Sequence, residues 1–206
     1  MKVRIDLKIL FFLGLFFLTK QIKIYLLVLG FAFLHELAHI VVGILLGFKL
    51  LQLEIMPFGF NINLIPRKED YEIKIKKSNL VKLKYIYVAI AGPLFNLFIA
   101  TIFSYISCNT EIITLIIYLN LLLFVFNLIP IYPLDGGRII YCILKINKGN
   151  FSAKKQMIII EKTTMIALTI ISSIAILYLK NIAIFLAILY LWNINWREKY
   201  KKNKTI

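Results

Sequence analysis

The sequence predicts an all-α polytopic membrane protein with about six transmembrane helices and a small β element between the second and third spans. Composition, the placement of basic residues and the length of the uncharged runs predict it. Hydrophobic residues make up 61% and charged residues 17% of the 206 residues, against about 45–50% and about 25% in globular domains. A chain of this length cannot bury so much apolar surface in one core. The composition therefore excludes a soluble enzyme, a disordered chain and a disulfide scaffold.

The basic residues indicate the topology. The formal net charge is +15, and nearly all of the 25 Lys and Arg residues fall in alternate segments between the apolar runs. Because cytoplasmic loops are enriched in Lys and Arg, both termini are expected in the cytoplasm. The positive charge then reflects topology and contact with the lipid bilayer, and nucleic acid is not an expected partner. Cys108 and Cys142 fall on opposite sides of this topology, so no disulfide is expected.

Six apolar runs are the expected spans of a single membrane-embedded domain, 1–206, with its core at 24–138. The first run follows a basic start, as in a signal peptide, but no small-residue cleavage site follows it, so retention as a short span is expected. The last two runs are separated by Lys180 and Asn181 and are expected to form a C-terminal helical hairpin, 163–196. The segments between runs, including 132–162, are expected to be loops. The expected spans are 5–18, 24–47, 83–107, 112–131, 163–179 and 182–196.

The loop after the second span changes its hydrophobic period. Apolar and small or polar residues alternate along 58–64, and alternation returns at 71–76, with a turn expected around 66–70. This pattern predicts two short strands. One interpretation is a purely structural sheet at the membrane edge. The other is an edge strand, with Phe58 and Phe60, that binds an extended substrate by strand addition.

The strongest chemical signal lies deep in the second span, at His35-Glu36-Leu37-Ala38-His39. Side chains four residues apart project from one face of a helix, so the two imidazoles can converge on one metal ion. Zinc accepts imidazole nitrogen, and a catalytic zinc site keeps one position for water. Glu36 is then placed to take a proton from that water. A buried glutamate without such a role would be costly in lipid.

Two histidines leave zinc one protein ligand short, and Asp135 is the candidate for the third. It follows a long apolar run, Pro130 and Pro133 interrupt the helix before it, and Gly136–Gly137 permit a sharp turn that could bring the carboxylate into the bundle. Irregular backbone is tolerated at membrane depth where it lines a cavity. The alternative is a loop in which Asp135 pairs with Arg138.

Together these motifs resemble the site-2 protease family of intramembrane zinc metalloproteases. The matching elements are HELAH at 35–39, AGPLFN at 91–96 and LDGG at 134–137, and the resemblance spans about 24–138. It implies one Zn²⁺ per chain held by His35, His39 and Asp135, with Glu36 as the catalytic base.

The resemblance extends to a segment before the LDGG element. Asn127, Pro130 and Pro133 match the Asn-then-Pro approach of the family to this element, which implies that they shape the site and contact substrate. In the intervening span, Asn96 could form a hydrogen bond in the core, or could simply pack between helices with Gly92.

The resemblance implies hydrolysis of a peptide bond in a membrane-associated protein, at a bacterial cell membrane and under membrane-protein regulators. In the sporulation-type members of the family, the substrate is a sigma-factor precursor. A housekeeping protease of stress signalling is an alternative. A non-proteolytic zinc transporter or scaffold is an alternative from another class, but transporters often show internal repeats, which this sequence lacks, and such a protein would not need Glu36.

Overall fold

The computed structural model describes residues 2–5, 17–18, 20, 22–56, 59–65, 75–106, 110–179 and 192. These residues are mostly helical and form two compact units, Met1–Leu128 and Ile129–Ile206. The first unit holds a sheet and three helices, and the second holds one long helix. The elements are β1 (Lys2–Ile5), α2 (Ile22–Leu45), β2 (Lys49–Met56), β3 (Gly59–Ile65), α3 (Ile75–Ser104), α4 (Glu111–Asn127) and α5 (Asp135–Leu179).

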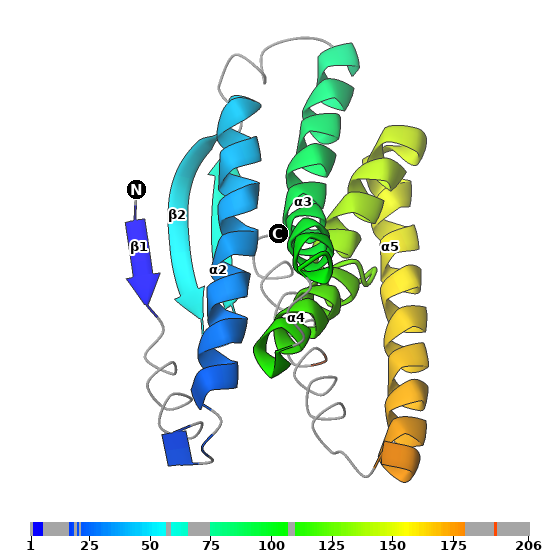
Figure 1. The fold of residues 1–206 in the computed structure, drawn as a ribbon. Helices are drawn as coiled ribbons and strands as arrows, with labels where there is room; N and C mark the ends of the chain where they lie inside the picture. Colours follow the sequence, from blue (N-terminus) through cyan, green and yellow to red (C-terminus); the bar gives the residue numbers. More distant parts are fainter. Residues whose placement is uncertain are drawn as a thin grey trace. The chain divides into compact units, whose positions relative to one another are not determined.

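Helix α2 is central to the first unit. It packs against α3 and also against β3, while α4 packs against α3 (Figure 1). The strand order is β1-β2-β3, with β1 parallel to β2 and β2 antiparallel to β3. The helix that carries the two histidines therefore contacts both the sheet and the next helix.

A glycine ends α2 and directs the chain into the sheet. Gly47 adopts a left-handed conformation, with φ of 88°. The amide of Phe48 donates to the carbonyl of Gly43 at 2.9 Å. The amide of Gly47 donates to the carbonyl of Ile44 at 3.0 Å. This is the Schellman motif, which satisfies the last carbonyls of a helix. The buried ring of Phe48 then contacts Tyr85 of α3 edge-on, with ring centroids 4.9 Å apart.

Helix α4 begins at a cap and is shorter than the other helices. The Thr110 side chain accepts a hydrogen bond from the amide of Ile113 at 3.4 Å, and Glu111 lies in the first turn. Both features favour a helix N-terminus. Its 17 residues fall below the usual length of a transmembrane helix.

Helix α5 shows that the expected loop at 132–162 is wrong. The whole of Asp135–Leu179 is helical except for a break at Gly149, where φ is 75° and ψ is 171°. The segment contains Lys, Ile and Leu, which are good or moderate helix formers, so only the glycine interrupts it. A buried stripe follows the break at helical spacing, formed by Ala153, Met157, Glu161, Met165 and Ser172.

Three of the described helical segments are long and apolar enough to cross a membrane. They are Ile22–Leu45, Asn79–Ser104 and Asp135–Ile174. Nearly all of the expected spans at 5–18 and 182–196 lies outside the described residues. The expected strand at 58–64 overlaps β3. Most of the expected strand at 71–76 lies outside the described residues, and its last two residues belong to α3.

Candidate metal centre

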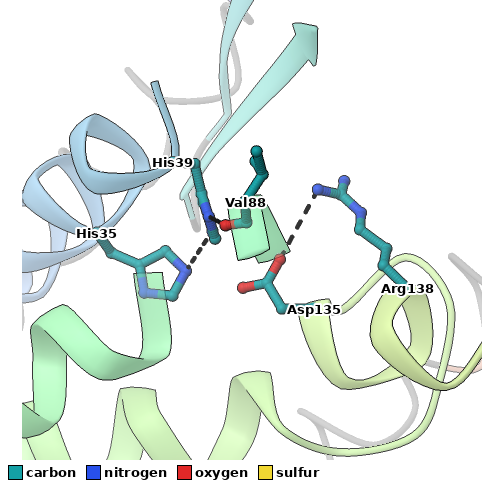
Figure 2. Close-up of polar contacts among 5 residues, drawn as sticks. All are labelled: His35, His39, Val88, Asp135 and Arg138. Atoms are coloured by element: carbon teal, nitrogen blue, oxygen red, sulfur yellow. Dashed lines mark hydrogen bonds and ion pairs between the residues drawn. The ribbon is translucent and has the colours of Figure 1, made fainter. Parts of the chain in front are cut away.

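The two histidines of the chain form a close pair on α2. Both side chains are buried, and their Nε2 atoms lie 3.1 Å apart (Figure 2). The rings meet edge to face, with centroids 4.7 Å apart. One helical turn separates His35 from His39, so both side chains project from the same face of α2. The pair can therefore present two ring nitrogens to one metal ion.

The backbone of α3 fixes the orientation of His39. Its Nδ1 lies 2.6 Å from the carbonyl oxygen of Val88 (Figure 2). A carbonyl oxygen only accepts hydrogen bonds, so Nδ1 must be the donor. In the neutral imidazole the Nε2 atom then carries a lone pair, which is the form that binds a metal.

Gly92, one turn further along α3, lies against both imidazoles. A Cβ atom at this position would be 2.5 Å from Nε2 of His35 and 2.5 Å from Nε2 of His39. These are the atoms that would bind a metal. Helix α3 contacts the His35 ring through Asn96 and the His39 ring through Val88. A side chain at position 92 would therefore displace the candidate ligands, which explains a glycine within a helix at this point.

Asn96 lies one turn beyond Gly92, on the same face of α3. Its side chain is fully buried, and its Nδ2 lies 3.0 Å from Nδ1 of His35. Its Oδ1 is also buried and has no hydrogen-bond partner among the described residues. Of the two roles that the sequence left open for Asn96, hydrogen bonding in the core is therefore the one observed.

Glu36 follows His35 directly on α2 and is half-buried. Successive residues of a helix are rotated by about 100°, so Glu36 lies beside the face that carries the imidazoles. Its role as a catalytic base stays a prediction.

In the second unit, Asp135 is the first residue of α5 and is buried. Its Oδ1 lies 3.7 Å from Nη1 of Arg138, three residues later (Figure 2). The ion pair of the alternative interpretation is thus present. The Arg138 side chain is 37% exposed, whereas the carboxylate of Asp135 is buried.

The glycines after Asp135 do not form the expected sharp turn. Gly136 and Gly137 belong to the first turn of α5, and the irregular segment precedes them at residues 128–134. A Cβ atom at Gly137 would lie 2.5 Å from the carbonyl carbon and oxygen of Ile131. This glycine therefore allows close packing between the linker and the helix that begins at Asp135.

The other residues expected to bind substrate are placed as follows. Asn127 ends α4 and donates from Nδ2 to the carbonyl of Leu123 at 3.0 Å. Pro130 and Pro133 lie half-buried in the linker. Phe60 lies on β3, opposite Ile55 of β2. Phe58 lies outside the described residues.

Donor chemistry makes zinc a suitable metal for this chain. His35 and His39 of the first unit offer two imidazole nitrogens, and Asp135 of the second unit offers a carboxylate oxygen. A catalytic zinc site commonly has three protein ligands of these types. The sequence does not predict the contact of Val88 with His39, because every residue type has a backbone carbonyl.

The chain is similar in sequence to a peptidase family and to two known proteins. Peptidase family M50 matches residues 108–171, which include Asp135. Stage IV sporulation protein FB of Bacillus subtilis is 27% identical over 128 residues, covering 60% of this chain and 41% of that protein. A zinc metalloprotease of Methanocaldococcus jannaschii is 30% identical over 129 residues, covering 59% of this chain and 34% of that protein. The chain thus matches less than half the length of each relative.

A solved structure shares the fold. The site-2 protease from Methanocaldococcus jannaschii aligns with a TM-score of 0.63 and 24% identity, over 95% of this chain and 89% of that one. Three of the described helical segments are apolar and long enough to cross a membrane, and the match to Peptidase family M50 covers residues 108–171. Within that segment the chain is similar to Peptidase family M50, and it is homologous to the sporulation protein and to the archaeal protease.

Proposed function

We propose that this chain is an intramembrane zinc metalloprotease that hydrolyses a peptide bond in a membrane-associated protein. In this proposal His35, His39 and Asp135 hold one zinc ion, and Glu36 is the catalytic base. The observation that carries it is the buried imidazole pair, whose Nε2 atoms are 3.1 Å apart and which lies on an apolar helix. The homology to a zinc metalloprotease supports the choice of metal and of reaction.

The chemistry that zinc supplies when bound is polarisation of a carbonyl group and acidification of a water molecule. The Glu36 carboxylate would accept a proton from the attacking water, whose oxygen would form a bond to the scissile carbonyl carbon. Glu36 then passes the proton to the departing amide nitrogen as the C–N bond breaks. The hydrogen bond from His39 to Val88 keeps one imidazole oriented throughout.

Strand β3 is the proposed binding site for substrate. It pairs with β2 along one edge, and no other described strand pairs with its second edge. It also packs against α2, which carries the two histidines. Proteolysis needs an extended backbone, and an extended segment can add to a free strand edge. Phe58, Phe60, Asn127, Pro130 and Pro133 stay the residues that the sequence proposes for substrate contact.

The test is co-expression with membrane-tethered transcription-factor precursors, scored for a shorter product. A sigma-factor precursor tests a role in sporulation, and a tethered stress-response regulator tests a housekeeping role. Wild type should cleave one of these in a zinc-dependent manner, while Glu36→Gln should bind zinc without cleaving. Equal cleavage by the Glu36→Gln variant would refute the assignment of the base, and zinc binding without cleavage of any precursor would favour a transporter or scaffold.

A further inference from the structure

The orphaned oxygen of Asn96 is the observation that the proposed mechanism leaves unexplained. Its Nδ2 faces Nδ1 of His35 at 3.0 Å, whereas Oδ1 is buried without a partner among the described residues. A buried carbonyl oxygen without a hydrogen bond destabilises the folded protein, because it loses its contact with water. Such a group within contact distance of a candidate metal ligand calls for an explanation.

The hydrogen positions follow from the neighbouring contacts. As the amide lies, Nδ2 donates to Nδ1 of His35, so a neutral His35 carries its hydrogen on Nε2. That hydrogen points to Nε2 of His39 at 3.1 Å, which is an acceptor because the Nδ1 atom of His39 donates to Val88. This arrangement satisfies both rings but leaves His35 in the tautomer that cannot bind a metal through Nε2.

Metal binding through Nε2 requires the other tautomer of His35. Its hydrogen must then sit on Nδ1, and the atom that faces Nδ1 must be an acceptor. A half-turn of the Asn96 carboxamide exchanges its oxygen and nitrogen in nearly the same two positions. This rotation brings the orphaned Oδ1 to Nδ1 of His35, which then donates to it, and moves Nδ2 to the position that Oδ1 occupied.

We propose that Asn96 is a positioning residue that selects the metal-binding tautomer of His35 by accepting a hydrogen bond from Nδ1 through its Oδ1. This inference rests on the proposed zinc site and adds a residue to it. Asparagine suits the position because one carboxamide can serve either tautomer, as donor or as acceptor. Val88 and Asn96, eight residues apart on one face of α3, then hold His39 and His35 respectively.

Two substitutions separate this role from packing. Asn96→Leu keeps a similar volume but removes the acceptor, and zinc affinity should fall about 10- to 100-fold, as when a partner of a metal-bound histidine is lost. Asn96→Asp keeps an acceptor oxygen and should bind zinc at least as tightly as wild type. Affinity is measured on the purified full-length chain in detergent, by competition with a zinc chelator.

Asn120 provides a matched control. It is also fully buried and also has an unpartnered Oδ1 among the described residues, but its Nδ2 donates to Ile116 of its own helix. Asn120→Leu should leave zinc affinity unchanged. If Asn96→Leu bound zinc as tightly as wild type, or if Asn120→Leu lost as much affinity, the proposed role of Asn96 would be wrong.

Nuclear magnetic resonance gives a second readout that needs no variant. The chain has two histidines, so labelling histidine with ¹⁵N reports four ring nitrogens. In the zinc-loaded protein the Nδ1 hydrogen of His35 should be strongly hydrogen-bonded and slow to exchange with deuterium. Rapid exchange would overturn the inference even if Asn96→Leu failed to fold. A wild type that binds zinc with these properties but cleaves nothing would instead overturn the proposed proteolytic function alone.

Discussion

His39 donates a hydrogen bond from Nδ1 to the backbone carbonyl of Val88 at 2.6 Å, joining α2 to α3 across 49 residues of sequence. A backbone acceptor cannot be removed by most substitutions, so this orientation of the imidazole is robust. One turn further along α3, Gly92 leaves the space that the two Nε2 atoms occupy. The packing between α2 and α3 therefore fixes the geometry of the imidazole pair.

Glu36→Gln tests the base. Glutamine is nearly isosteric but does not accept the proton of water, so cleavage should fall about 10²- to 10⁴-fold, while zinc content stays at the wild-type level. Product yield and zinc content are measured on the same purified samples. Loss of zinc along with activity would contradict the assignment of Glu36 as a base that is not a ligand.

Gly92→Ala tests the close approach of α3. The added methyl group would meet both Nε2 atoms, and such overpacking costs about 1–3 kcal/mol. Zinc affinity should therefore fall about 5- to 150-fold, as measured by chelator competition. Gly30→Ala on α2 is the control, because nothing lies within 4 Å of a Cβ atom there, and its zinc affinity should match that of wild type.

Asp135→Asn distinguishes a ligand from a partner of Arg138. If Asp135 binds zinc, its replacement should lower zinc affinity by at least about tenfold. Arg138→Ala should retain zinc, because the guanidinium that pairs with the carboxylate is not a proposed ligand. Zinc titration of both variants is the measurement. Equal zinc affinity in wild type and Asp135→Asn would favour the purely structural ion pair.

Proline substitutions test the edge of β3 with which no other described strand pairs. Alternate residues of a strand direct their amides to opposite edges, so Ile62→Pro and Asn63→Pro remove amides from different edges. One variant should lose pairing with β2 and thermal stability. The other should keep its thermal stability in detergent but slow cleavage, because proline cannot donate to an added strand. Unchanged cleavage in the stable variant would indicate a purely structural sheet.

Gly47→Ala tests the turn that joins α2 to the sheet. A residue with a Cβ atom in the left-handed conformation costs roughly 1–2 kcal/mol, so the thermal unfolding midpoint should fall. Zinc affinity at low temperature should change little, because His39 lies two turns before the cap. A large loss of zinc affinity in the fully folded variant would show that the cap also positions the imidazoles.

Local pattern predicted some elements well and others poorly. The imidazole pair follows from helical periodicity alone, because residues four apart share a face whatever surrounds the helix. The loop expected at 132–162 is wrong for residues 135–162, because charged residues are compatible with a helix whose charged side faces water. The roles of Asp135 and Glu36 stay predictions that the experiments above address.

The amino-acid sequence by itself determined the apolar character of the chain, the one-sided pair of histidines and the glutamate between them. Only the tertiary structure decided what holds those histidines. Val88 contributes a carbonyl that every residue type possesses, and Asn96 lies 61 residues from His35. Contacts of this kind arise from the packing of one helix on another, and packing brings together residues whose separation along the chain carries no periodic signal.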